Sequence, residues 1–119
     1  MATMSKAGSR SFEEPDEQAE KGGVKIDIVY LGDLKVKRAN YPAGWRFSEK
    51  MGADHCGDTH VGYVIDGLMH VKLNDGSTFD TRAGDAFVVP ANHDAWTEGG
   101  CTIVQFDEFD AAARRFGLS

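Results

Sequence analysis

The residue types best suited to metal chemistry gather in one stretch of the chain, Ala53–Trp96. This stretch contains His55, His60 and His93, with Cys56 beside the first of them. Three imidazoles can hold one ion and leave open positions for water or substrate, a set that suits Zn, Fe, Ni or Cu. A thiolate is a further ligand for such ions. The stretch therefore predicts a divalent metal centre. The alternative is a metal-free pocket, because a lone buried histidine is usually a satisfied core residue.

Strand geometry determines which of these side chains face inward. Side chains alternate between the two faces of a strand, so His60 shares a face with Gly62 and Val64. In a small barrel that face points inward, and the missing side chain of Gly62 leaves room for a ligand. By the same rule either His55 or Cys56 faces inward, but not both. The third ligand is therefore left open between these two residues.

Other side chains near this stretch are candidates for catalysis or for the pocket wall. Glu49 is a candidate proton acceptor or extra ligand, and Tyr63 is a candidate catalytic hydroxyl. Alternation places Tyr63 on the face opposite His60, which argues against that role. Trp96, together with Gly62 and Val64, is a candidate for the substrate-pocket wall.

Two further residues have simpler expected roles. His70 lies on the face opposite Met69 and Val71, so we expect it at the surface. Cys101 is expected to be a small buried hydrophobic residue. A disulfide between Cys56 and Cys101 is not expected, because a cytosolic location keeps thiols reduced.

The elements that must position these residues are short strands separated by turn residues. Asp66-Gly67, Asn74-Asp75-Gly76 and Ala83-Gly84-Asp85 each accept the positive φ of a tight turn. The expected strands are Val24–Tyr30, Leu34–Arg38, Trp45–Glu49, His60–Ile65, Leu68–Leu73, Ser77–Thr81, Ala86–Val89 and Cys101–Phe106. This pattern predicts an antiparallel, all-β barrel.

The two ends of the chain differ from this pattern. Residues Met1–Gly23 contain Phe12 as their only aromatic side chain and are rich in polar residues, which predicts a flexible N-terminal arm. A single domain is expected over residues 24–119. Its last part, Glu108–Phe116, has acidic residues first and basic residues last, followed by Gly117, which predicts a short C-terminal helix.

The central turns carry two motifs of a known family. His60 is followed after six residues by Gly67, and Gly84 is followed after five residues by Pro90. These spacings resemble the two motifs of the cupin superfamily, with His60 in place of the first motif's Glu. The similarity runs over Ala39–Phe106 and is greatest to small, single-domain bacterial cupins of the RmlC-like type. It implies a jelly-roll barrel.

The resemblance also implies where metal ligands would lie. In metal-binding cupins the matching positions are Ala53, His55, His60 and Ala95, so two of the four carry an imidazole here. His93 lies two residues before the last position, and an altered loop would bring it to the mouth of the barrel. The resemblance thus implies a divalent transition metal held by a modified ligand set.

Composition limits the possible partners. A net charge of −6 and an isoelectric point near 5.1 argue against nucleic acid or an anionic membrane. No apolar run has the length of a membrane span, which predicts a cytoplasmic protein. The strands Val24–Tyr30 and Leu34–Arg38 would leave an open sheet edge, which predicts a homodimer.

Two functions fit these observations. The first is a metal-dependent cupin enzyme that acts on a small polar or carboxylate-bearing metabolite, as a dioxygenase, isomerase or decarboxylase. The second is a non-catalytic cupin without metal that binds or senses a small molecule.

Overall fold

The computed structural model describes residues 8–32, 34–51 and 59–106. The predicted C-terminal helix, Glu108–Phe116, lies outside these ranges. Within them, no helix has the length and apolar character needed to span a bilayer.

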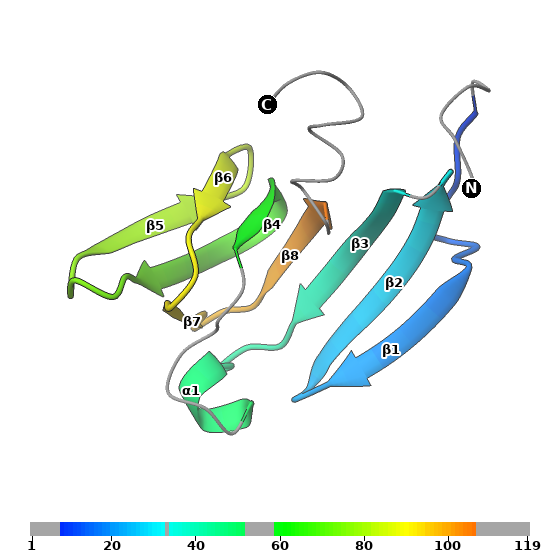
Figure 1. Cartoon of the computed structure of the whole chain (residues 1–119). Helices are drawn as coiled ribbons and strands as arrows, with labels where there is room; N and C mark the ends of the chain where they lie inside the picture. The colour runs from blue at the N-terminus through cyan, green and yellow to red at the C-terminus, as the bar shows by residue number, and fades with distance from the viewer. Residues whose placement is uncertain (1–7, 33, 52–58, 107–119) are drawn as a thin grey trace, which may run out of the picture.

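The described chain is mostly antiparallel β-sheet (Figure 1). The elements are β1 (Glu17–Lys21), β2 (Val24–Leu31), β3 (Leu34–Tyr41), α1 (Phe47–Lys50), β4 (His60–Lys72), β5 (Thr78–Arg82), β6 (Ala86–Val89), β7 (Asp94–Trp96) and β8 (Cys101–Phe106). Strands β1, β2, β3, β8 and β4 lie side by side in that order. The all-β prediction is confirmed, but the pairings among the described strands do not close into a complete barrel.

The long strand β4 joins two parts of this sheet. Its first half pairs with β8 on one side and β6 on the other, and its second half pairs with β5 and β7. A register shift between Val64 and Asp66 marks a β-bulge at the junction. Such a bulge bends a strand, so β4 can take part in both halves of the sheet.

This bulge corrects one expectation from the sequence. Asp66-Gly67 was expected to be a hairpin turn, but both residues lie inside β4 and pair with β8. The extra residue reverses the alternation: Gly62 and Val64 are buried before the bulge, and Met69 and Val71 are buried after it. His60 and His70 therefore face opposite sides of the same strand.

The segment before β2 also differs from the prediction. Part of the expected flexible arm, Glu17–Lys21, forms β1 and pairs along its whole length with β2. Backbone hydrogen bonds position this segment, because all of its side chains are exposed. Upstream of it, Phe12 packs against a cluster of Val29, Leu34 and Val36 on the same chain.

The expected strand Trp45–Glu49 is wrong. Only a single bridge, Arg46 to Trp96, occurs there, and α1 follows immediately. The reason is a tertiary contact, because the Asp94 carboxylate accepts hydrogen bonds from the Ser48 backbone N–H and hydroxyl. An acceptor at the first turn of a helix stabilises the helical turn over an extended strand.

The main core lies between the two halves of the sheet. Its buried members include Trp45, Val64, Met69, Val71 and Ile103. Val64, Met69 and Val71 come from β4, Ile103 comes from β8, and Trp45 lies between β3 and α1. The core therefore joins elements of both halves of the sheet.

Candidate functional site

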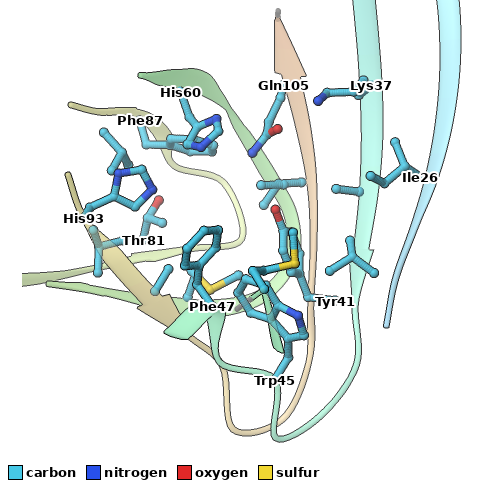
Figure 2. A pocket seen from close by; sticks show the side chains of 18 of the residues that line it. Ile26, Lys37, Tyr41, Trp45, Phe47, His60, Thr81, Phe87, His93 and Gln105 are labelled. Atoms are coloured by element: carbon cyan, nitrogen blue, oxygen red, sulfur yellow. The ribbon is translucent and has the colours of Figure 1, made fainter. Parts of the chain in front are cut away.

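A cavity of about 420 Å³ opens between the two halves of the sheet. This volume lies within the usual range of small-molecule sites. Much of its wall is apolar and aromatic, including Tyr41, Trp45, Phe47, Met69 and Phe87. The polar side chains of the wall include His60, His93, Lys37, Gln105 and Thr81, and Figure 2 shows how they are arranged.

Two of the predicted ligands, His60 and His93, meet in this cavity. Their ring centroids are 5.1 Å apart and the ring planes are inclined by 77°. His60 comes from the start of β4, and His93 follows β6, whose Val89 pairs with His60. Strand pairing therefore brings together two residues that are far apart in the sequence.

The hydrogen bond of His93 sets its tautomer. Nδ1 lies 2.8 Å from the backbone carbonyl oxygen of Pro90. A carbonyl can only accept, so Nδ1 carries the proton, and in the neutral ring Nε2 is then the nitrogen that can bind a metal. Metal-binding histidines commonly have this arrangement, with the second ring nitrogen donating to a backbone carbonyl.

The spacing of the two rings fits a shared ion. With a metal–nitrogen distance of about 2.1 Å and tetrahedral angles, two bound imidazoles have centroids roughly 5 Å apart. The observed 5.1 Å agrees with this value. Within the described ranges, no group of three or more His, Cys, Asp or Glu residues is placed to hold an ion. The candidate third ligands, His55 and Cys56, lie outside the described residues.

The other predicted site residues do not line the cavity. Glu49 is exposed on α1, because the segment turns into a helix where a strand was expected. Tyr63 is 47% exposed on the face opposite His60, as alternation predicted. Trp96 faces the other way, where it stacks on His70 and lies under the Arg46 guanidinium.

Gly62 and Val64 face inward but belong to the packed core. A Cβ on Gly62 would lie 2.1 Å from the carbonyl oxygen of Val104, so the position offers no room for a ligand. Val64 is completely buried in the core. Close approach of β8 to β4 at this point accounts for both observations.

Three polar side chains of the cavity wall were missed by the sequence analysis. Lys37, Gln105 and Thr81 were not among the site residues that the sequence predicted. The alternation of side chains along a strand could have indicated two of them. Lys37 shares a face with Ala39 and Tyr41, and Gln105 shares one with Ile103. The Thr81 hydroxyl oxygen is buried and has no hydrogen-bond partner among the described residues.

Cys101 is buried and unpaired in the described structure, as expected for a small hydrophobic residue. Burial, with a smaller contribution from Asp66, raises the pKa of the Cys101 thiol to about 11. Because the thiolate is the reactive form, this residue is not suited to act as a nucleophile at neutral pH.

His70 forms a polar cluster outside the cavity. Its Nδ1 lies 2.6 Å from a carboxylate oxygen of Asp80 and its Nε2 lies 2.7 Å from one of Glu98. The hydrogen bond to Asp80 raises the pKa of His70, burial opposes this effect, and the hydrogen bond to Glu98 adds to it. The protonated ring can donate to both carboxylates at once.

This cluster makes part of the stability depend on pH. Because the pKa of His70 is higher in the folded state, its contribution is complete below the unfolded pKa of about 6.5 and is lost as pH rises through the folded pKa. We expect His70→Gln to lower the free energy of unfolding by about 1 kcal/mol more at about pH 5.5 than at about pH 8.5. Urea denaturation of both proteins at the two pH values tests this. An equal difference at both values would assign the effect of His70 to stacking on Trp96 alone.

No family model matches the sequence, and no curated protein matches it. Among solved structures, the chain is similar to an RmlC-like cupin from Shewanella frigidimarina, with 24% identity, a TM-score of 0.56, and coverage of 79% of this chain and 84% of that one. It is similar to KdgF from a Halomonas species, with 23% identity, a TM-score of 0.57, and coverage of 84% and 92%. A protein of unknown function from Vibrio parahaemolyticus aligns with 16% identity and a TM-score of 0.58, over 76% of this chain and 95% of that one.

These similarities define the class of the protein by its fold. The chain has the cupin fold, as its two sequence motifs implied.

Proposed function

We propose that this small cupin holds a divalent transition metal in its pocket and acts on a small polar or carboxylate-bearing metabolite. The observation that supports this most directly is the pair of imidazoles, His60 and His93, at a spacing that suits a shared ion inside a ligand-sized cavity. A bound ion would polarise an oxygen of the metabolite. Oxidation, isomerisation and decarboxylation are all compatible with this set of residues.

The chain's own residues have separable roles in this proposal. His60 and His93 bind the ion, and the Pro90 carbonyl holds the His93 ring in the required tautomer. The apolar wall around Trp45 and Phe47 excludes water from the bound metabolite, which strengthens polar interactions inside the pocket. The unpartnered Thr81 hydroxyl is available to a polar group of the metabolite.

Metal titration by calorimetry tests the proposal. We expect His60→Ala and His93→Ala each to weaken Zn²⁺ binding by more than about 100-fold, because each removes a ligand from the ion. His70→Ala is the matched control, since His70 lies outside the cavity, and it should leave the affinity unchanged. His55→Ala and Cys56→Ala, measured alongside, identify which of the two completes the ligand set.

The second candidate is a metal-free cupin that binds or senses a small molecule. It is favoured by the ligand count, because the described residues supply two imidazoles and no third donor. If wild type binds no divalent ion more tightly than the His60→Ala and His93→Ala variants do, this second function replaces the first.

A further inference from the structure

We propose that the pocket selects an organic monocarboxylate with an apolar body, and that Lys37 and Gln105 bind its acid group. This rests on the proposed function, because it names the chemical class of the metabolite for the same cavity. The proposal adds a carboxylate site that is separate from the histidine pair.

The two proposed residues are cross-strand neighbours. Lys37 on β3 and Gln105 on β8 lie directly opposite each other in the register, and both line the cavity. Side chains of such a pair have Cβ atoms about 5 Å apart on the same face of the sheet. Gln105 in turn lies opposite Gly62 of β4, two residues from His60. The ammonium and the amide therefore lie at the same end of the cavity as His60 (Figure 2).

Basic side chains occur in the described part of the cavity wall. The whole chain carries a net charge of −6, yet the described residues that line the cavity include Lys21 and Lys37 and no Asp or Glu. A lysine at the wall of a partly desolvated pocket interacts more strongly with an anion than a surface lysine does. An ammonium group in the cavity wall is a suitable partner for an acidic ligand.

Gln105 gives a second, independent indication. The residue is only 6% exposed, and its side chain lines the cavity. A side-chain amide in a cavity wall offers two N–H donors to a ligand. A carboxylate oxygen would accept a hydrogen bond from this amide while the second oxygen pairs with Lys37.

The other end of the cavity is aromatic and suits the apolar part of the ligand. Tyr41 lies four residues beyond Lys37 on the same face of β3, roughly 13 Å along the strand. There it contacts Trp45 edge to face, with ring centroids 4.7 Å apart. Figure 2 shows Tyr41, Trp45 and Phe47 together at this end, away from Lys37 and Gln105. An aromatic or aliphatic body would bury its apolar surface there.

A matched pair of probes tests the proposal, namely 3-phenylpropanoate and its neutral amide, 3-phenylpropanamide, which share one shape. We expect wild type to bind the acid at least about ten-fold more tightly than the amide, because a charge-assisted contact distinguishes them. Lys37→Met should bring this ratio close to one, and Lys37→Arg should largely preserve it. Gln105→Leu should weaken binding of the acid by about ten-fold. Lys35→Met is the control, since Lys35 is on β3 but not in the cavity wall.

Calorimetry with Zn²⁺ and with chelator separates this proposal from the metal proposal. An acid preference that persists in chelator and disappears in Lys37→Met supports the Lys37–Gln105 site, even if no metal binds. A preference that survives Lys37→Met, or that requires the metal, would assign the acid group to the ion and overturn the proposal. Failure of the acid to bind wild type at millimolar concentration would overturn it as well.

Discussion

Gly67→Ala should destabilise the protein by about 3 kcal/mol or more, because two separate costs apply at this position. Gly67 has a φ of +85°, in the region that residues with a Cβ avoid. A Cβ there would also lie 2.2 Å from the carbonyl oxygen of Gly100, a backbone atom that cannot rotate away. The substitution therefore strains the backbone and forces β8 away from β4 next to the bulge.

Gly76→Ala is the matched control for this prediction. Gly76 has nearly the same φ, +88°, but a Cβ there would meet no atom within 4 Å. It should therefore show only the conformational cost, about 1–2 kcal/mol. Urea denaturation of the two variants measures the difference, which is the contribution of the close contact between β4 and β8. Equal losses of stability in both variants would mean that β8 moves aside without cost.

Asp94→Ala should have an effect of similar size, about 3 kcal/mol. The Asp94 side chain is 11% exposed and lies 3.0 Å from the Arg46 guanidinium. It also accepts hydrogen bonds from the Ser48 backbone N–H and hydroxyl at 3.1 and 2.9 Å. Its removal leaves several donors without a partner in a largely buried location, which costs more than the loss of one exposed ion pair.

Two variants separate the components of this effect. Asp94→Asn keeps an oxygen acceptor for the Ser48 N–H and should lose less stability than Asp94→Ala. Ser48→Ala removes only the hydroxyl and should cost about 1 kcal/mol.

Because α1 carries Phe47 of the cavity wall, Asp94→Ala should also weaken binding of 3-phenylpropanoate. Denaturation and calorimetry on the same three variants test both statements. Unchanged stability in Asp94→Ala would show that the network does not hold α1 in place.

Much of the strand content could be predicted from local sequence. The segments Val24–Leu31, Leu34–Tyr41 and Cys101–Phe106 are strands in the structure. All three were expected, although the second was expected to end three residues earlier, at Arg38. Period-two alternation identifies such segments because each strand buries one face. The same rule placed His60 inward, since this residue precedes the bulge and no register shift intervenes. Together with the two motifs, it was sufficient to predict the cupin fold.

The sequence could not predict which distant residues share the cavity. Alternation shows that Lys37 and Gln105 each share a face with apolar neighbours, but the register of β3 against β8 places them opposite each other. The bulge in β4 is likewise a property of pairing with β8, and it turned an expected hairpin turn into continuous strand. Glu49 was misplaced because a distant carboxylate, Asp94, stabilises the helical turn. The local pattern thus determined the strands and the imidazole donors, whereas the composition of the pocket depended on long-range pairing, which only the tertiary structure decides.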